Sequence, residues 1–139
     1  MDGYAAAGDL LKVCGHPVRL QILEVLLRDG EACVCHLESH LGQRQAAISQ
    51  HLARLRQAGL VVDRRDGWNI FYSVTDPSIQ RVVTAARRTA SQVAQLGGDR
   101  LAFDLAGRRE ANTCPCPRCE KPDPGRASRK QSRPSARAE

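Results

Sequence analysis

The sequence predicts a mainly α-helical fold with a β-hairpin wing, the winged helix-turn-helix. Four segments with apolar residues at helical spacing come first, and a short turn joins the third to the fourth. Two runs rich in β-branched and aromatic residues then flank Asp66-Gly67, a strong hairpin signal. One long amphipathic segment follows. Helices in this order, with a hairpin directly after the helix-turn-helix, are typical of DNA-binding domains.

The first two helical segments have clear boundaries. The stretch "YAAAGDLLKVC" is a short amphipathic helix that ends near Gly15. The stretch "HPVRLQILEVLLRDG" has Pro17 in its first turn, where the missing N–H costs nothing, and Gly30 ends it. Its core-facing stripe is Ile22, Leu23, Leu26 and Leu27.

The next two segments form the helix-turn-helix itself. The stretch "EACVCHLESH" is a short third helix that ends at Leu41-Gly42, and its buried stripe is Val34, Leu37 and Leu41. The stretch "QRQAAISQHLARLRQAG" is the fourth helix and ends at Gly59. Its buried positions are Ile48, Leu52 and Leu55.

The hairpin "LVVDRRDGWNIFYSV" is followed by a long helix, "DPSIQRVVTAARRTASQVAQLGG". The apolar side of this last helix is Ile79, Val82, Val83, Ala86, Ala90 and Val93. Together with the apolar first helix, this side is more than a small core of roughly 100 residues can cover. We therefore expect a homodimer.

Composition divides the chain into a folded body and a tail. The 139 residues suggest a DNA-binding and dimerisation domain over residues 1–98 and a flexible, basic, Cys/Pro-rich tail over residues 99–139. Residues 1–107 carry 12 Lys/Arg and 11 Asp/Glu, a net of +1, whereas residues 108–139 carry 9 and 4, a net of +5. The high pI therefore belongs mainly to the tail, and basic tails are usually solvated.

Nothing in the sequence indicates a membrane partner. The stretch "MDGYAAAGDLLKV" is acidic and interrupted, unlike a secretory leader, and no apolar run approaches the ~18 residues of a spanning helix. We expect a cytoplasmic protein. In that compartment six cysteines indicate metal or redox chemistry rather than structural disulfides.

The fourth helix and the hairpin carry the residues expected to contact double-stranded operator DNA. Small and polar side chains lie opposite the buried positions of the helix and can reach base edges and phosphates in a major groove. Positions 44 to 65 hold five Arg and one Asp, a local +4. The alternative for this face is an ordinary solvated helix surface. The predicted contacts are Arg44, Gln45, Ser49, Gln50 and Arg54 on the helix, with Arg64 and Arg65 beside the hairpin turn.

Cys33 and Cys35 stand where a regular helix would hold them apart. Residues two apart on a helix diverge by ~200°. In an extended segment, residues two apart point to the same side. The two thiols can therefore share one ion if the first helical turn opens, directly before the DNA-reading helix. The alternative is a pair of small buried hydrophobic side chains.

Residues 15–74 closely resemble the ArsR/SmtB family of metal-sensing bacterial repressors. The resemblance covers about residues 8–95 and rests on "HPVRLQIL", "CVC-x-L", "S-x-H-L-x-x-L" and "G-L-V" in this order. It implies a dimer that binds an imperfect inverted repeat in its operator and dissociates when metal binds. It also implies that Gln45, Ser49, Gln50 and His51 read DNA. His51 leans toward the buried side of its helix, and a packing or hydrogen-bonding role is an equal alternative.

The resemblance further implies that "CVC" begins a site used by arsenic, antimony, cadmium and lead sensors. Arsenic sensors commonly have a third cysteine three residues after the second, but here that position is Glu38. Trivalent arsenic and antimony prefer three thiolates, so Cys33 and Cys35 alone are too few for a tight site. The family's other sites are absent, since Ser78 stands where a histidine ligand is expected and the fourth helix has no cysteine.

The tail motif "TCPCPRC" can supply the missing sulfur from Cys114, Cys116 or Cys119. From residue 98 to residue 114 the chain can extend ~50 Å, enough to reach the cysteine pair of either protomer. Alternatively, the three tail thiolates hold an ion of their own, a metalloid or zinc with a fourth ligand. A third possibility is an unbound, redox-labile cluster.

The predicted function is a metal(loid)-responsive transcriptional repressor. The expected inducer is arsenite or antimonite, and next cadmium, lead or zinc, with no organic cofactor. The competing hypothesis is a thiol redox, persulfide or iron–sulfur sensor on the same fold. An enzyme is not expected, because no Cys–His or Ser–His–Asp constellation, phosphate loop or metalloprotease pattern is present. Cys14 is expected in the core, and His16, His36 and His40 are usable ligands for zinc or cobalt, although each alone is more typical of a cap or surface histidine.

Overall fold

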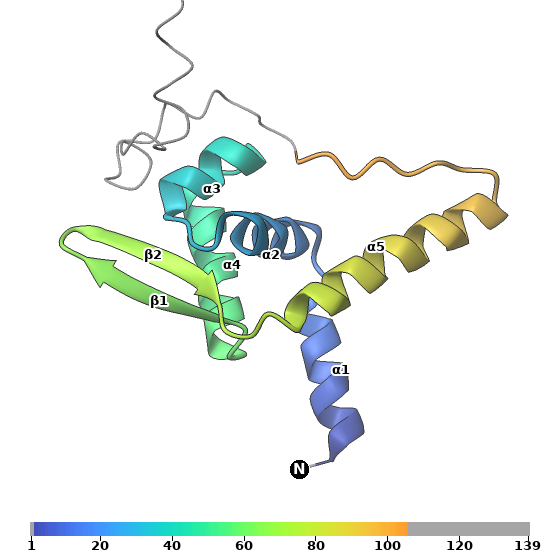
Figure 1. The fold of residues 1–139 in the computed structure, drawn as a ribbon, viewed down its shortest axis with the longest axis horizontal. Coiled ribbons are helices and arrows are strands. Elements are labelled where there is room, and N and C mark those ends of the chain that lie inside the picture. The colour runs from blue at the N-terminus through green and yellow to red at the C-terminus, as the bar shows by residue number, and fades with distance from the viewer. Residues whose placement is uncertain (1, 106–139) are drawn as a thin grey trace, which may run out of the picture.

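The structure of the chain is a computed structural model that describes residues 2–105 (Figure 1). Its elements, in chain order, are α1 Gly3–Cys14, α2 Pro17–Asp29, α3 Val34–Leu41, α4 Gln45–Gln57, β1 Val61–Asp66, β2 Asn69–Val74 and α5 Ile79–Leu96. Helices α2, α3 and α4 form the centre, the hairpin lies to one side, and α1 and α5 extend away from it. The predicted winged helix-turn-helix and its element order are confirmed.

The core lies between the three central helices. All three predicted buried positions of α4 have 0 % exposure, as do Ile22 and Leu23 of α2 and Leu37 of α3. The apolar stripe predicted for α2 omits Val25, which is fully buried, and includes Leu27, which is only half-buried. The buried face is therefore wider than the predicted stripe. The physical reason is that α2 contacts α1, α3, α4, α5 and β2, and therefore needs an apolar face wider than a single stripe.

The cap of α2 is a histidine. Nδ1 of His16 accepts the backbone N–H of Val18 at 3.1 Å, and Pro17 is the first helical residue, as predicted. Gly30 ends the helix with φ +83°, a conformation that favours glycine. His16 therefore acts as a helix cap in this structure.

The structure corrects the expected start of the third helix. Cys33 is extended, with φ −85° and ψ 169°, and its Sγ accepts the N–H of His36 at 3.4 Å as the N-cap of α3. Only Cys35 lies within the helix. The cause is a bridge to the wing, since Ala32 and Tyr72 exchange two backbone hydrogen bonds of 3.0 and 2.8 Å. This bridge keeps the chain extended up to Cys33.

The wing is a regular antiparallel hairpin, with register from Val61↔Val74 to Asp66↔Asn69. Its turn is Gly67-Trp68 rather than the predicted Asp66-Gly67, because Asp66 is the last paired residue of β1. Gly67 has φ +60°, and a type II′ turn requires glycine at this first central position.

Helices α1 and α5 carry apolar side chains that the protomer does not bury. Tyr4 is 91 % exposed, Leu11 60 %, Val93 62 % and Leu96 90 %. Of the predicted apolar side of α5, only Ile79 and Val83 are buried. Within residues 2–105, no helix combines the length and apolar character needed to cross a bilayer.

Residues 99–105 form neither helix nor strand. In this segment the ring of Phe103 lies under the Arg87 guanidinium at 4.9 Å, and Leu105 packs against the core. The tail cysteines predicted as ligands, Cys114, Cys116 and Cys119, lie outside the described residues.

Candidate functional site

Helix α4 presents the predicted DNA-reading face to solvent. Its apolar residues point into the core, so its small and polar residues point outward. Neither Arg44 nor Arg54 forms an ion pair with another residue of the part of the chain that is described. The predicted contacts that are exposed on this helix are Arg44, Gln45, Ser49, Gln50 and Arg54.

The N-terminus of α4 is open to an anion. Arg44 is its N-cap residue and forms no side-chain capping hydrogen bond. The first backbone N–H groups of the helix therefore have no side-chain partner at the cap. Such N–H groups, together with the positive end of the helix dipole, attract phosphate.

His51 is half-buried, unlike the other predicted residues of α4. Its ring lies 4.4 Å from the ring of His16, the cap of α2. Burial lowers the pKa of His51, and the neighbouring His16 and Arg19 lower it further. His51 thus connects α4 to the start of α2, which favours the packing alternative for this residue.

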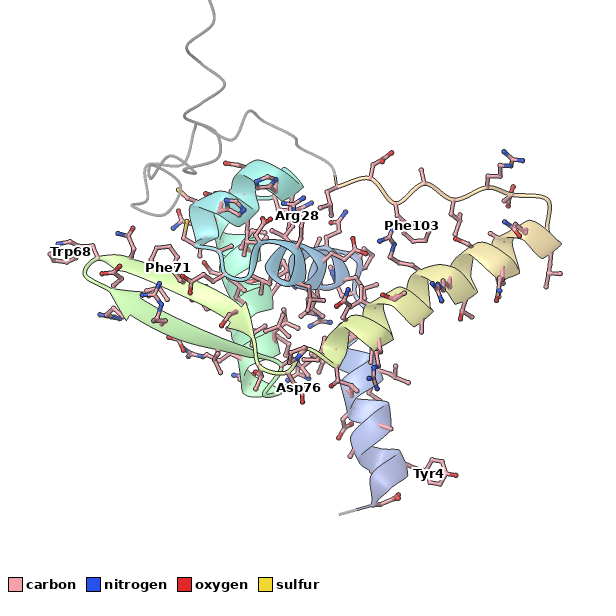
Figure 2. All side chains as sticks on the ribbon, viewed as in Figure 1. Tyr4, Arg28, Trp68, Phe71, Asp76 and Phe103 are labelled. Carbon is pink, nitrogen blue, oxygen red and sulfur yellow. The ribbon has the colours of Figure 1, made fainter. Side chains whose placement is uncertain are left out.

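The two wing arginines leave β1 on opposite faces, because successive strand residues alternate. Nη2 of Arg64 donates to Oε1 of Glu31 at 2.7 Å, and its guanidinium lies over the Phe71 ring at 5.0 Å. Arg65 forms no ion pair with any residue from 2 to 105. Trp68, in the turn, is 102 % exposed and points away from the body of the protein (Figure 2).

Cys33 and Cys35 flank the first residue of α3 but differ in exposure. Cys33 is 7 % exposed, whereas Cys35 is open to solvent. Neither belongs to a group of three potential metal ligands within residues 2–105. The described residues therefore bring no third ligand to this pair, and a shared ion at Cys33 and Cys35 stays a prediction.

Cys14 is a core residue, as predicted. It is 3 % exposed and belongs to the central apolar cluster. Burial raises the pKa of its thiol, and the positive charge of Arg19 opposes that rise only in part. A thiol that is buried and protonated is a poor ligand for an incoming ion.

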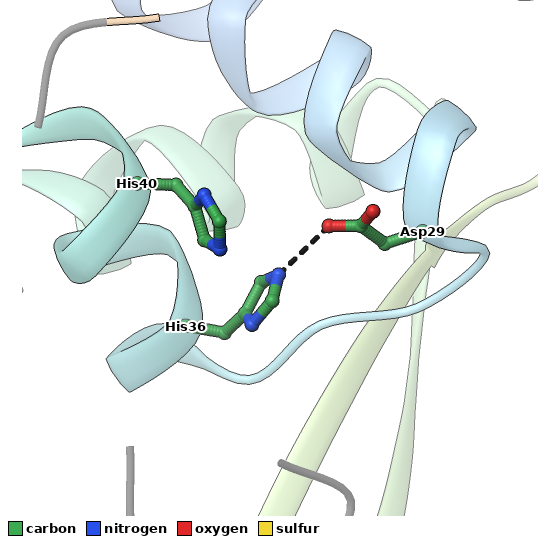
Figure 3. A group of neighbouring side chains, drawn as sticks. All are labelled: Asp29, His36 and His40. Atoms are coloured by element: carbon green, nitrogen blue, oxygen red, sulfur yellow. Dashed lines mark hydrogen bonds and ion pairs between the residues drawn. The ribbon is translucent and has the colours of Figure 1, made fainter. Parts of the chain in front are cut away.

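Three other potential ligands meet between α2 and α3. Each of these residues offers one ligand atom, and the three atoms lie within 4.8 Å of one another. The residues are Asp29, His36 and His40 (Figure 3). Asp29 is the last residue of α2, and the two histidines lie one turn apart on α3. Nε2 of His36 is 2.8 Å from Oδ2 of Asp29, and the two imidazole rings are 4.3 Å apart.

Arg28 completes this arrangement. It donates to both carboxylate oxygens of Asp29, at 2.8 and 2.9 Å. The hydrogen bond from Arg28 is the largest cause that lowers the pKa of Asp29 to about 2; burial opposes it, and His36 adds to it. The pKa of His40 is lowered by burial first, and then by the charges of His36 and Arg28.

Sequence reasoning missed three features of this surface. Trp68 was visible as an aromatic residue beside the hairpin glycine. The pairing of Glu31 with Arg64 joins residues far apart in the sequence, and no local pattern predicts it. The spacing of His36 and His40 does predict a shared helix face, but Asp29 joins them only through the α2–α3 turn.

A sequence profile described as "Bacterial regulatory protein, arsR family" matches residues 16–62. These residues run from the cap of α2 into β1, and so include the complete helix-turn-helix. The matched segment contains every predicted DNA contact of α4 and both cysteines of the CVC motif.

Two relatives illustrate the similarity in sequence. The chain is 42 % identical over 77 residues to an uncharacterized HTH-type transcriptional regulator of Methanocaldococcus jannaschii, which covers 55 % of this chain and 86 % of that protein. It is 32 % identical over 109 residues to the arsenic resistance transcriptional regulator ArsR1 of Pseudomonas putida. This match covers 77 % of this chain and 84 % of that protein.

Two solved structures show the same similarity in three dimensions. Reduced HlyU from Vibrio cholerae matches with a TM-score of 0.56 and 40 % identity, over 62 % of this chain and 90 % of that chain. The AntR antimony-specific transcriptional repressor matches with a TM-score of 0.55 and 30 % identity, over 64 % of this chain and 83 % of that chain. Arsenic and antimony are named for two of these four proteins and not for HlyU, so the similarity alone does not select an inducer.

Proposed function

The chain belongs to the arsR family of bacterial regulatory proteins, and from this premise we propose that it is a metal(loid)-responsive repressor. Proteins of this family are DNA-binding transcriptional regulators, not enzymes. In the proposed cycle a homodimer holds its operator until a thiophilic ion binds Cys33 and Cys35.

In the proposed DNA complex α4 lies in the major groove. Its exposed Gln45, Ser49 and Gln50 contact base edges, because their amides and hydroxyls can both donate and accept. Arg44 and Arg54 contact phosphates on either side. His51 supports α4 through its contact with His16 rather than by reading a base.

The proposed dimer is formed by the exposed apolar sides of α1 and α5. These helices extend from the body and expose Tyr4, Leu11, Val93 and Leu96 (Figure 1). Leaving such large apolar side chains in water is unfavourable by ~25 cal/mol for each Å². A second copy would bury them and place two α4 helices on successive major grooves.

One observation carries the sensing part of the proposal: the segment that supplies Cys33 is bonded to the wing. Ala32 exchanges two backbone hydrogen bonds with Tyr72, and Glu31 pairs with Arg64. Cys35 lies in α3, which packs on α4. An ion that draws Cys33 and Cys35 together would therefore act on the wing and on the DNA-reading helix at once.

The proposed inducer is arsenite or antimonite, and next cadmium, lead or zinc. Two thiolates come from Cys33 and Cys35, and a tail cysteine (Cys114, Cys116 or Cys119) supplies the third. The family relatives named for arsenic and antimony support this choice. A separate ion held by the tail alone remains the second version of the proposal.

A thiol redox, persulfide or iron–sulfur sensor is the second candidate function. The exposure of the Cys35 thiol favours it, because an accessible thiol can react with an oxidant or a persulfide. The two candidates differ in their requirement for metal. A metal sensor releases DNA with a stoichiometric ion under reducing conditions, whereas a redox sensor responds to oxidant without metal.

The test is a titration of the protein–operator complex. The operator is selected from a random duplex pool with the metal-free full chain. Arsenite, antimonite, cadmium, lead and zinc are then added separately while thiols are kept reduced, and an oxidant is added without metal in a parallel series. Release by one stoichiometric ion supports the proposal, and release by oxidant alone supports the second candidate. The absence of release by any ion would contradict the proposal.

A further inference from the structure

Nitrogen and oxygen donors converge between the end of α2 and α3, apart from the thiol pair. His36, His40 and Asp29 each place one ligand atom within 4.8 Å of the other two, and each residue is half-buried (Figure 3). Within residues 2–105, no other three histidine, cysteine or acidic side chains come this close. The arrangement joins two helices rather than lying on a single exposed surface.

A four-coordinate ion requires a rearrangement of these atoms, because separations of up to 4.8 Å must shorten while the shortest one lengthens. Zinc holds nitrogen and carboxylate oxygen at ~2.0 Å, so two ligand atoms of a tetrahedral site are ~3.3 Å apart. Nε2 of His36 and Oδ2 of Asp29 are now 2.8 Å apart. They need to separate by only about half an ångström to admit the ion. The ion would be bound by the Nε2 lone pair of neutral His36, in the tautomer that carries its single proton on Nδ1.

The donors are held in place before an ion arrives. His36 and His40 are four residues apart on α3, the spacing that puts two histidines on one helix face. That helix is fixed by Leu37 and Leu41, which are 0 % and 1 % exposed. Arg28 holds both oxygens of Asp29 and thereby sets the orientation of the carboxylate.

The chemistry of these donors disfavours arsenite and antimonite, the first-choice inducers of the thiol pair. Two imidazoles and a carboxylate suit zinc, cobalt(II) or nickel, whereas arsenite requires thiolates. A four-coordinate ion would need one further donor besides these three. The two sites meet at the start of α3, where Sγ of Cys33 accepts the backbone N–H of His36.

We propose that Asp29, His36 and His40 bind a divalent cation of the zinc class, independently of every cysteine. The ion joins the end of α2 to α3 and so fixes the first helix of the helix-turn-helix. The chain then carries two ion sites of different chemistry, one made of sulfur and one of nitrogen and oxygen.

The test uses the full chain with Cys33, Cys35, Cys114, Cys116 and Cys119 replaced by serine. Zinc binding is measured by competition with a chromophoric chelator. We expect one bound equivalent, and a rise in Tm of about 10 °C when zinc is one hundred times Kd. His36→Gln, His40→Gln and Asp29→Asn should each weaken zinc by at least ~100-fold. The matched control is His51→Gln, which removes a histidine outside the group and should leave zinc affinity unchanged.

A second measurement covers the case in which the serine variant does not fold. In the wild-type chain, cobalt(II) bound to this site should give d–d bands without sulfur-to-cobalt charge transfer, and His40→Gln should remove that equivalent alone. No zinc binding by a folded serine variant, or a cobalt(II) spectrum of the wild-type chain that His40→Gln leaves unchanged, would overturn the proposal. Because these readouts use neither DNA nor thiols, their failure is distinct from failure of the proposed repressor function.

Discussion

Replacing Arg65 by alanine tests which wing arginine neutralises DNA phosphates. Arg64 is paired with Glu31 at 2.7 Å, whereas Arg65 has no ionic partner among residues 2–105. The two side chains leave opposite faces of β1. Arg65 is therefore available to the DNA backbone, and Arg64 must first leave a carboxylate that already neutralises it.

The expected magnitude follows from counterion release. Each phosphate contact contributes ~0.9 to the slope of log K against log salt, and a dimer has two wings, so Arg65→Ala should lower the slope by ~1.8. Between about 50 and 200 mM salt, the ratio of wild-type to variant affinity should then fall about 12-fold. Arg64→Ala should change the slope much less. Glu31→Gln should increase it, because Arg64 is released.

The assay is fluorescence anisotropy of labelled operator at five or more salt concentrations, with a nonspecific duplex of the same length as the control. The loss of slope should be equal on both duplexes, since phosphates carry no sequence information. If Arg65→Ala leaves the slope unchanged, or if Arg64→Ala lowers it as much, the assignment of the wing arginines from their pairing is refuted.

The core, the dimer surface, the wing bridge and the tail can each be tested with one variant. Leu52→Ala should lower the free energy of unfolding by about 2–5 kcal/mol in urea titrations, because Leu52 has 0 % exposure; a loss under about 1 kcal/mol would contradict its core position. Val93→Glu should give monomers in sedimentation experiments while Gln92→Glu gives dimers, and dimers from both would move the interface away from α5. Ala32→Pro removes the N–H donated to Tyr72 and should reduce inducer-driven DNA release while Cys33 and Cys35 still bind ion; unchanged release would exclude the wing bridge as the connection. Truncation after Gly107 should weaken the inducer response and lower sulfur coordination from three to two in X-ray absorption, whereas loss of a separate equivalent with unchanged release would favour a tail site of its own.

The sequence predicted the element order because each element has its own local signal. Periodic leucines mark α2 to α4, and Gly30, Gly42 and Gly67 mark turns that need a positive φ. The start of α3 was predicted wrongly because the cause is not local. Tyr72, forty residues away in the sequence, holds Ala32 in an extended bridge and delays the helix to Val34.

The same distinction between local signals and long-range contacts applies to the candidate site. The exposed face of α4 could be predicted because it is the complement of a buried stripe, and its contacts with DNA stay a prediction. The pairing of Arg64 with Glu31 and the meeting of Asp29 with His36 could not be predicted, because they depend on how the wing and α2 pack around α3. Contacts of this kind appear only once the helices are placed in space.

The most direct test of the central claim is operator release by the inducer in wild type, Cys33→Ser and Cys35→Ser. All three proteins should form dimers and bind operator with the same affinity, because neither thiol lies on the DNA-reading face of α4. Cys14→Ser is a matched control for the loss of a thiol, and it should keep its response because Cys14 is buried in the core. With thiols reduced, stoichiometric inducer should release DNA from wild type and not from either variant at position 33 or 35. Release from either variant at the wild-type inducer concentration would contradict the assignment of Cys33 and Cys35 as the sensing pair.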